Sequence, residues 1–576
     1  MEGHDTLLER IYREADKRPA KPKQSETFVP KLITVLREGY GRDGLQRDAI
    51  AGLTVAIVAL PLAMALGIAS GASPDKGLIT AIVAGLLISA LGGSRVQIGG
   101  PTGAFVVVVY GVIAKHGYDG LLLATLLAGV ILIVAGYSGF GRLIRFVPHP
   151  VVTGFTAGIA VIIATSQIRD FLGLPRAAFS GDFAERAGQV LQLLEAIDPV
   201  TAGIGITALL TLVGLRRFAP RLPGYLIAII IFSAIVAVFG LPADTIGTRF
   251  PNMTLGIPYP SLPILSLAKI EAVLPAAFTI AFLAGIEALL SAVVADGMTG
   301  FQHRPNQELV GQGIANIASS LFGGLPATGA IARTATNVRA GGRTPFSGIL
   351  HALFLLFFVL VGSRLMQLVP MAVLAAILLM VAWGMSEAGR FIALLRIRSS
   401  ERWILLITFG LTVMVDLTVA IGVGVTLASL NFLARMSETV TITSGDTEIG
   451  EDRDQRDALP FNVEVFRING PLFFGVTTEL LEALKRIGQI PRTIILRMEL
   501  VPWLDSSGSA ALHDFLKRAH AMGSDVILCG VQPNVRDMLD RAEIEKTSVA
   551  RRFAPDYPSA LRSAQSGMLS ADQAGS

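Results

Sequence analysis

Cysteine and charge are both scarce in this sequence, and each shortage excludes a class of protein. Cys529 is the only cysteine among the 576 residues, so no disulfide can form within the chain. Charged residues make up 16% of the sequence and hydrophobic residues 52%, with a mean hydropathy of +0.60. A soluble globular protein carries about 25% charged residues. The composition therefore excludes an ordinary soluble protein and indicates a membrane protein.

Motifs of many enzymes and of nucleic-acid-binding proteins are also missing. The sequence contains no Walker phosphate loop, no dinucleotide-binding fingerprint and no metal-ligand spacing of histidines and acids. The net charge is only +4, and no Lys/Arg-rich block is interleaved with aromatic residues, so no nucleic-acid partner is expected. Residues 1–24 are charged and lack the apolar core of a cleavable signal peptide. We expect a membrane protein that is not an enzyme and that uses no metal or organic cofactor.

Long apolar runs follow one another through most of the chain. A spanning helix needs about 20 mainly apolar residues, and by this rule the sequence predicts twelve membrane segments, some of them short. Two further runs, 104–113 and 330–338, are too short to span alone and are predicted to be half-helices, which gives fourteen elements. The expected fold is an α-helical polytopic membrane protein. The twelve segments are 49–70, 77–91, 120–137, 151–171, 201–215, 222–239, 273–294, 309–322, 346–361, 369–385, 403–415 and 417–433.

Basic residues in the short loops predict how these segments are oriented. They fall on one side of the membrane if each half-helix and its lead-in count as one crossing, and the positive-inside rule makes that side cytoplasmic. The N-terminal segment, 1–42, lies on the same side, and an even number of crossings returns the C-terminus to it. We expect a multi-pass protein of the inner (cell) membrane with both termini in the cytoplasm. The loop residues are Arg142, Arg145, Arg216, Arg217, Arg221, Arg339, Arg343, Arg390, Arg396, Arg398 and Arg402.

Two stretches interrupt the apolar pattern. GGPTGAFVVVV begins at Gly99 and GGLPATGAIARTATN begins at Gly323, and both contain the triplet Thr-Gly-Ala. Each stretch lies between two long apolar segments, at the third element of its half of the chain. The placement predicts an internal repeat whose discontinuous helices meet near the bilayer centre, which is the sequence pattern of a transporter binding site.

The two breaks predict an anion site built from helix N-termini. A helix that begins at mid-membrane leaves its first N–H groups unpaired and directs the positive end of its dipole at a ligand, as at phosphate-binding and carboxylate-binding helix N-termini. The alternative is a pair of Gly/Pro kinks whose polar groups are satisfied by neighbouring helices. The predicted substrate-binding residues are Thr102, Gly103, Ala104 and Phe105 from the first half and Thr328, Gly329, Ala330, Ile331 and Arg333 from the second.

Arg333 and Glu287 are the charged residues predicted to act at this site. An arginine at the bilayer centre costs at least about 2.5–3.5 kcal/mol, so Arg333 needs either a bound anion or a permanent salt bridge, for which Glu287 is the obvious partner. Glu287 is the only acid well inside segment 273–294, and a desolvated carboxyl beside a cation can change protonation when an anion arrives. The alternative is a glutamate that stays neutral or stays paired. Ser291 and Gln97 are predicted supporting residues.

The sequence becomes polar after Leu433. We predict a transmembrane domain over 43–436, a linker over 437–460, a soluble α/β domain over 461–558 and a disordered tail over 559–576. The predicted strands are 462–468, 492–498 and 525–531, and the predicted helices are 477–488, 504–523 (with its preceding loop) and 532–544. Ser506 and Ser507 lie where a strand leads into a helix. Helix capping is the default role there, and Ser507 is the candidate phosphorylation site.

These residues and motifs resemble the sulfate permease (SulP/SLC26) anion-transporter family. The similar stretches include AGLTVAIVALPLAMALGIASGASPDKGL, GGPTGAFVVVVYGVI, IEALLSAVVADGMTG and ATGAIARTATNVRAGGRT, in the family's order. The region containing DSSG resembles a STAS domain, and the resemblance covers about 43–558. It implies a seven-plus-seven inverted repeat divided into a core and a gate domain. It also implies a homodimer, with substrate bound between the third and tenth elements and moved by an elevator-like shift of the core.

The resemblance also implies a substrate class and a coupling ion. The sequence of these motifs most resembles that of bacterial proton-coupled C4-dicarboxylate transporters. Those proteins transport succinate, fumarate and aspartate and carry a glutamate at the position of Glu287. The sodium-coupled bicarbonate members have an aspartate there and a threonine near Ser291, so the proton is the expected coupling ion and sodium is not. Animal members carry serine where Ala332 stands, which argues against their chloride exchange. In anti-sigma-factor antagonists the phosphorylated serine matches Ser507.

The sequence therefore predicts a secondary active transporter that imports a C4-dicarboxylate with protons. Other readings stay open: a sulfate or bicarbonate symporter, an anion channel or exchanger, or a membrane-anchored scaffold that acts through its STAS domain. The expected partners are a small anion, the lipid bilayer, a second copy of the chain, and a cytosolic protein at the STAS domain.

Overall fold

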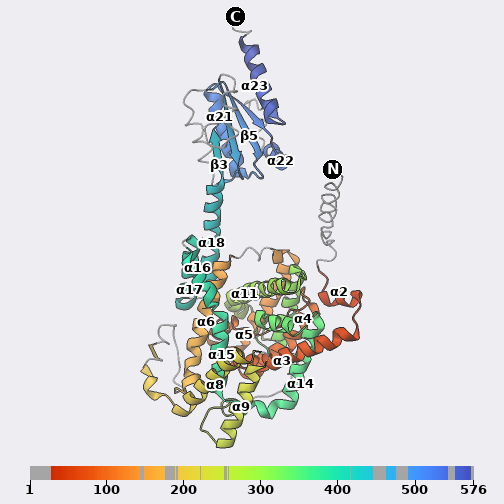
Figure 1. Ribbon diagram of the computed structural model, residues 1–576, viewed down its shortest axis with the longest axis vertical. Helices are drawn as coiled ribbons and strands as arrows, with labels where there is room; N and C mark the ends of the chain where they lie inside the picture. Colours follow the sequence, from red (N-terminus) through yellow and green to blue (C-terminus); the bar gives the residue numbers. More distant parts are fainter. Residues whose placement is uncertain are drawn as a thin grey trace, which may run out of the picture. The chain divides into compact units, whose positions relative to one another are not determined.

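The computed structural model describes residues 28–142, 148–175, 188–189, 192–220, 222–251, 256, 258–397, 399–415, 417–444, 462–474, 491–541 and 552–572. The chain divides into two compact units, Met1–Val425 and Thr426–Ser576, which we call the membrane unit and the C-terminal unit. The described part of the membrane unit is helical apart from one two-stranded ribbon, whereas the C-terminal unit contains a five-stranded sheet (Figure 1).

Helices follow the apolar runs closely. Each of the twelve predicted segments overlaps one helix, and the two predicted half-helices coincide with the first part of α5 and with α13. Nine helices in the described part of the chain are long and apolar enough to cross a membrane by themselves, so the count of fourteen elements stays a prediction. The helices are α2 (Lys31–Glu38), α3 (Arg42–Ala69), α4 (Pro74–Leu91), α5 (Phe105–Tyr137), α6 (His149–Leu172), α8 (Pro199–Phe218), α9 (Gly224–Phe239), α10 (Ile246–Arg249), α11 (Leu267–Thr299), α12 (Pro305–Leu321), α13 (Ile331–Arg339), α14 (Pro345–Met366), α15 (Met371–Met385), α16 (Ala388–Arg396), α17 (Ser400–Met414) and α18 (Leu417–Thr439), with 3-10 turns η2 (Phe140–Arg142) and η4 (Leu194–Ala196).

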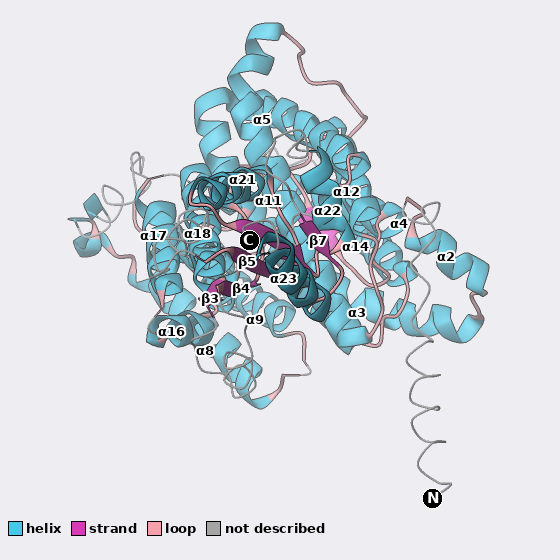
Figure 2. Ribbon diagram, turned by 90° about the horizontal axis from the view of Figure 1, so that it is seen from above, coloured by secondary structure: helices cyan, strands magenta, loops and turns pink. Residues whose placement is uncertain are grey.

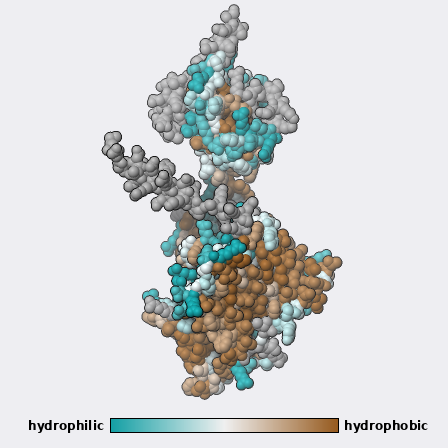
Figure 3. Space-filling model, turned by 90° about the vertical axis from the view of Figure 1, so that its right-hand side faces the viewer, coloured by the Kyte–Doolittle hydropathy of each residue, from teal (hydrophilic) through white to brown (hydrophobic). Residues whose placement is uncertain are grey.

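Apolar side chains cover a broad face of the membrane unit (Figure 3). Phe218, Val238 and Val361 are 86%, 78% and 70% exposed. Contiguous apolar surface of this kind is unfavourable in water and is solvated by lipid. Helices satisfy their backbone polar groups internally, as a lipid-embedded chain requires. The prediction of a polytopic α-helical membrane protein is confirmed.

The helices of the membrane unit form two groups. In the first group α3, α4 and α14 contact one another, α5 packs against α11 and α12, and α13 contacts α3 and α11. In the second, α15 and α17 pack on α6, and α8 contacts α6, α9 and α15. Figure 1 shows α6, α8 and α17 on one side of the unit and α3, α4 and α14 on the other. The groups meet where α3 contacts α9 and α15, and we call them the first and second helix groups.

Both predicted breaks are present. The first is a two-residue strand, β1 (Gly99–Gly100), followed by α5, and Gly117 has a non-helical backbone (φ 71°, ψ 179°) that divides α5 into a short first part and a long second part. The second break is β2 (Thr328–Gly329), which leads into α13. β1 and β2 pair antiparallel, with Gly99 opposite Gly329 and Gly100 opposite Thr328. The two interrupted elements therefore meet.

The C-terminal unit has its five strands in the order β3-β4-β5-β6-β7. β3 is antiparallel to β4, and the remaining neighbours are parallel. Helices cover both faces of the sheet: Leu512 of α21 and Val535 of α22 are buried on one face, and Ala560 of α23 is buried on the other (Figure 2). The elements are β3 (Thr441–Ser444), β4 (Val463–Asn469), β5 (Thr493–Leu500), α21 (Ser506–Ala521), β6 (Asp525–Cys529), α22 (Pro533–Arg541), β7 (Arg552–Ala554) and α23 (Tyr557–Asp572).

Two boundaries predicted for this unit are wrong. Residues 441–444, placed in the linker, form edge strand β3, because the β-branched Thr-Ile-Thr run pairs with β4. Residues 559–572, placed in the disordered tail, belong to α23, because Ala560 and Ala564 are buried against the sheet. The predicted strands and the helices 504–523 and 532–541 each match an element of the structure, whereas residues 542–544, helix 477–488 and most of the linker lie outside the described residues.

Helix α2 is attached to the membrane unit by a partly buried lysine and an arginine. The Lys31 backbone N–H donates to the Gly92 carbonyl over 3.1 Å. The Arg304 side chain donates to the Val29 carbonyl and to the Thr34 hydroxyl, both over 2.8 Å. Burial lowers the pKa of Lys31 to about 8, with added repulsion from Arg304 and Arg95. The folded state therefore opposes protonation of this amine.

Lys31→Met is expected to raise the unfolding temperature at pH 7, and the gain should shrink as the pH rises. The unfolded lysine titrates near 10.5, so between about pH 8 and 10.5 the unfolded chain binds more protons than the folded one. Stability of the wild type therefore increases with pH across that window. Thermal unfolding in detergent at pH 7 and pH 10 tests this. A gain that is equal at both pH values would contradict it.

Candidate functional site

The antiparallel pairing of β1 with β2 brings the predicted site residues of both halves together. Beyond the ribbon pairs, the Ala330 N–H donates to the Ile98 carbonyl over 2.8 Å, and the Ile98 N–H donates to the Thr334 hydroxyl over 3.0 Å. The starts of the two half-helices, near Thr102 and Ile331, directly follow this ribbon. The predicted meeting of two interrupted segments is thus present in the structure.

Several N–H groups at these helix starts are free. The first three N–H groups of α13, on Ile331, Ala332 and Arg333, have no acceptor among the described residues, as expected for a helix N-terminus. The same holds in the described chain for the N–H groups of Gly103 and Ala104. Two predicted donors are otherwise engaged. The Phe105 N–H donates to the Thr102 carbonyl over 3.3 Å, and the Ala330 N–H is held by Ile98.

Arg333 is buried with most of its hydrogen-bonding capacity unused. Its side chain is 2% exposed, and its Nη2 donates to the Pro101 carbonyl over 3.1 Å. Nε and Nη1 are buried and have no partner within the described part of the chain. A Cβ atom at Gly100 (φ 149°) would overlap Nη1, so glycine makes room for the guanidinium. A buried cation with two free donor atoms is the feature expected of an anion site.

Glu287 reaches the start of the other half-helix. The Thr102 hydroxyl donates to Oε2 of Glu287 over 2.8 Å, which links α11 to the first break. The Glu287 carboxylate and the Arg333 guanidinium attract one another but form no direct hydrogen bond. The structure describes both residues and shows no salt bridge between them, which was the alternative to a bound anion. Glu287 is only partly buried. An acid, a hydroxyl and a guanidinium therefore surround the two helix starts.

The supporting residues have different roles in the structure. Ser291 is fully buried, and its Oγ lies 3.2 Å from Oγ1 of Thr334, so it braces α13. The Thr328 hydroxyl donates to the Ala284 carbonyl over 2.8 Å, which connects β2 to α11. Gln97 is 4% exposed, and neither atom of its amide has a partner among the described residues. Its amide lies against Gly329.

Sequence reasoning missed the polar residues that fix the register of the ribbon. Asn337 donates from Nδ2 to the Val96 carbonyl and to the Ser347 hydroxyl, both over 2.8 Å. Asn316 donates to the Ala327 carbonyl and accepts from its N–H, each over 2.9 Å. Thr334 and Asn337 are three residues apart on α13, on one face of a helix. The spacing of these two polar residues, close to Arg333, could have predicted from the sequence that they contact the first break.

His351 lies on the apolar helix α14. It is fully buried, and neither ring nitrogen has a hydrogen-bond partner in the part of the chain that is described.

The second helix group contributes one wall of the site. A Cβ atom at Gly103 would contact the Met385 sulfur of α15 and the Ile163 side chain of α6. The start of the first half-helix thus packs against the second helix group, while its partners α11 and α13 belong to the first. Ile331 is 37% exposed and Ala332 is also exposed, so the start of α13 is not covered by other described residues.

Comparison with known proteins agrees with this architecture. The profile of the sulfate permease family matches residues 45–408, and that of the STAS domain matches residues 460–560. This chain belongs to the sulfate permease family. It is 40% identical over 509 residues to the putative sulfate transporter YvdB of Bacillus subtilis (strain 168), covering 88% of this chain and 95% of that protein. It is 30% identical over 532 residues to the bicarbonate transporter BicA of a Picosynechococcus species, covering 89% and 92%.

Solved structures of sulfate permease relatives share the fold. The murine Slc26a9 anion transporter in the inward-facing state matches with a TM-score of 0.83 over 97% of this chain and 98% of that chain, at 18% identity, which shows likeness of fold alone. The transmembrane domain of a cyanobacterial BicA matches with a TM-score of 0.59 at 30% identity, over 68% and 98%. The chain is a membrane anion transporter of the sulfate permease family, and the prediction that it is not an enzyme is confirmed.

In the STAS domain of this sulfate permease, the capping prediction needs correction. Asp505 is the N-cap of α21, and its carboxylate accepts the Gly508 N–H over 2.6 Å. Ser506 and Ser507 are the first two helical residues, so neither is the cap. An aspartate satisfies the same orphan N–H groups as well as serine does. Phosphorylation of Ser507 stays a prediction.

Gly329→Ala is expected to lower transport by this permease about 5- to 150-fold. A Cβ atom there would overlap the Gln97 amide, and such overpacking costs about 1–3 kcal/mol. Uptake into proteoliposomes at low substrate concentration measures the loss. Gly297→Ala is the matched control, because a Cβ atom at that position of α11 meets nothing within 4 Å. Equal uptake by the two variants would rule out a role for this close approach.

Proposed function

We propose that the protein is a secondary active transporter that imports a small anion together with protons. The observation that carries the proposal is the meeting of two half-helix starts around the free donor atoms of Arg333. Five unpaired N–H groups in the described chain and one buried guanidinium are suited to an anionic ligand. The proposed substrate-binding residues are Thr102, Gly103, Ala104, Phe105, Thr328, Gly329, Ala330, Ile331 and Arg333.

Glu287 is the proposed proton-coupling residue. In the empty site its carboxylate and the Arg333 guanidinium balance one another in charge. An arriving anion would place a second negative charge beside the same arginine, which favours protonation of the carboxyl. Once protonated, Glu287 has no charge to oppose the substrate. Substrate and proton thus enter the site together, and on release both leave.

Proton co-transport also meets an electrical requirement. Moving an anion inward against an inside-negative potential costs about 2.3 kcal/mol per charge per 100 mV. Two or more protons carried with a dianion remove this cost. A sodium ion is not proposed, because the residues at Glu287 and Ser291 differ from those of sodium-coupled members.

A C4-dicarboxylate such as succinate, fumarate or aspartate is the proposed substrate. The sequence around the two breaks resembles that of dicarboxylate transporters, which favours this substrate. Donor groups from two separate helix starts also suit a ligand with two carboxylates. The named relatives are a putative sulfate transporter and bicarbonate transporters. Sulfate and bicarbonate are therefore the competing substrates, and an anion channel or exchanger is the competing mechanism.

The two helix groups supply the moving parts of the proposed mechanism. The first group, which carries both half-helices, would act as the core, and the second, which presents Met385 and Ile163, would act as the gate. An elevator shift of the core past the gate would expose the site to each side in turn. We place the protein in the inner membrane as a homodimer with both termini cytoplasmic.

Uptake into proteoliposomes tests the substrate and the mechanism together. Labelled succinate, fumarate, aspartate, sulfate and bicarbonate are compared with and without an inward proton gradient. The proposal expects dicarboxylate accumulation that requires the gradient, together with counterflow exchange. Accumulation of sulfate or bicarbonate alone would refute the substrate assignment, and unitary currents without counterflow would refute the carrier mechanism.

A further inference from the structure

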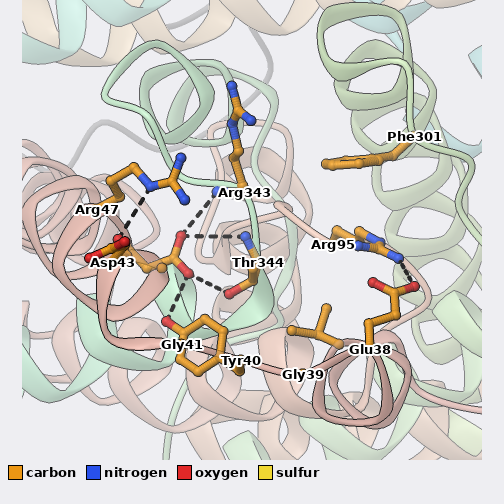
Figure 4. Close-up of a pocket in the computed structure, with 13 residues that line it drawn as sticks. Glu38, Gly39, Tyr40, Gly41, Asp43, Arg47, Arg95, Phe301, Arg343 and Thr344 are labelled. Carbon is orange, nitrogen blue, oxygen red and sulfur yellow. Dashed lines mark hydrogen bonds and ion pairs between the residues drawn. The ribbon is translucent and has the colours of Figure 1, made fainter.

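A polar cavity of about 360 Å³, separate from the anion site, lies near the N-terminal end of α3. Four connections and the first turns of α3 line it (Figure 4). Arg95 comes from the connection that leads into β1, and Arg343 follows the end of α13. The remaining lining residues are Val35, Glu38, Gly39, Tyr40, Gly41, Asp43, Gly44, Arg47, Asp48, Phe301 and Thr344. Both connections to the half-helices therefore reach this cavity.

Two of the three carboxylates in the cavity are fully engaged by the protein. Asp48 accepts from the Tyr40 hydroxyl over 2.9 Å, from the Arg343 N–H over 3.0 Å, and from the hydroxyl of Thr344. Glu38 pairs with Arg95. Asp43 is left, in the first turn of α3, where the helix dipole favours an acid.

Two of the three guanidinium groups are not neutralised in this way. Arg47 donates from Nε to the Asp43 carbonyl over 3.2 Å, and its terminal nitrogens have no partner among the described residues. The Arg343 side chain has none in the described chain either, because only its backbone N–H reaches Asp48. Arg95, in contrast, also lies over the Phe301 ring at 4.8 Å. The cavity thus has two available guanidinium groups against one carboxylate.

Apolar side chains next to the cavity indicate its depth in the bilayer. On α2, Val35 is 3% exposed and points inward, whereas Ile33 and Leu36 are 39% and 54% exposed. Leu45 on α3 is 46% exposed. A short amphipathic helix with basic residues and an exposed apolar side is typical of the membrane interface. This pattern predicts that the arginines of the cavity lie at the level of the lipid phosphates.

We propose that this cavity binds the phosphate group of an anionic phospholipid through Arg47 and Arg343. Guanidinium groups bind phosphate oxygens in paired hydrogen bonds. The lipid's acyl chains lie along Ile33, Leu36 and Leu45. Because Arg343 follows α13 and Arg95 precedes β1, a bound headgroup holds the outer ends of both segments that carry the anion site. The lipid thereby stabilises the first helix group.

Lipid titration of the full-length protein tests this site. The purified chain in detergent receives short-chain phosphatidylglycerol, phosphatidylcholine or inorganic phosphate, and the unfolding temperature and the bound mass are measured. Phosphatidylglycerol is expected to raise the unfolding temperature of the wild type by mass action. In R47Q/R343Q its affinity should fall about 30-fold, because each of the two arginines contributes about fivefold.

The control R37Q/R42Q removes the same charge from nearby residues that do not line the cavity, and should keep the wild-type affinity. Arg333→Gln should also keep it, because the anion site is separate. An unchanged affinity in R47Q/R343Q overturns the proposal. So does stabilisation by inorganic phosphate without stabilisation by lipid, or an equal effect of phosphatidylcholine.

Discussion

Arg333→Gln is expected to reduce uptake at low substrate concentration by about 30-fold or more. The guanidinium is 2% exposed, and its Nε and Nη1 have no partner in the described part of the chain. A bound anion would satisfy both atoms. Removing one member of a buried charge pair costs about 2–5 kcal/mol, which is at least roughly 30-fold in affinity. Initial uptake rates over a range of substrate concentrations measure the effect.

Two further variants distinguish charge from geometry at this site. Arg333→Lys keeps the charge but loses the planar fork of donors, so uptake should be intermediate. Arg339→Gln, at the exposed end of the same helix, is the matched control and should retain wild-type uptake. If R333Q transports as well as R339Q while both are folded, Arg333 does not bind the substrate.

Glu287→Gln is expected to abolish accumulation driven by a proton gradient while leaving exchange of substrate intact. Glutamine keeps a hydrogen-bonding partner for the Thr102 hydroxyl, which donates to Glu287 over 2.8 Å, but it cannot bind and release a proton. Each co-transported proton contributes about 1.4 kcal/mol per pH unit, or about tenfold accumulation. The variant should lose this factor. Concentrative uptake under an imposed pH gradient, compared with counterflow at equal pH, separates the two activities.

Glu271→Gln is the control for this experiment. Glu271 lies on the same helix as Glu287, near its N-terminal end, and is exposed. Its accumulation should match that of the wild type. If E287Q still responds fully to the gradient, another group carries the proton, and the coupling scheme must be abandoned.

The main elements of the membrane unit follow from local sequence. Apolar length predicted the helices, and glycine with proline at two places predicted the breaks, because both signals depend on neighbours along the chain. The ribbon contacts did not follow in the same way. Asn337 contacts Val96, 241 residues away, and such a partner depends on tertiary register. Arg333 could be predicted as a site residue because an arginine is costly at the bilayer centre. Asn337, one turn further along the same helix, carries no such cost and was not predicted.

In the C-terminal unit, too, local sequence did not predict the elements that depend on tertiary contacts. Helix α23 carries no long apolar run, and the packing of Ala560 and Ala564 against the sheet helps to stabilise it. Strand β3 is four residues long and is defined by its partner β4. Asp505 and Ser506 are both good caps by residue type. Which of them caps depends on where the helix begins, and local sequence leaves that uncertain by a residue or two.

The β1–β2 ribbon also has a consequence for biosynthesis. Ile98 and Thr334, which hydrogen bond at the ribbon, are 236 residues apart, and a ribosome adding about 5–20 residues per second needs tens of seconds to make the second after the first. During that time the nascent N-terminal half sits in the bilayer with an unpaired strand, whose bare backbone groups cost several kcal/mol each in hydrocarbon. The N–H and C=O groups of β1 gain their ribbon partners only after translation passes β2, so the anion site is assembled late in biosynthesis.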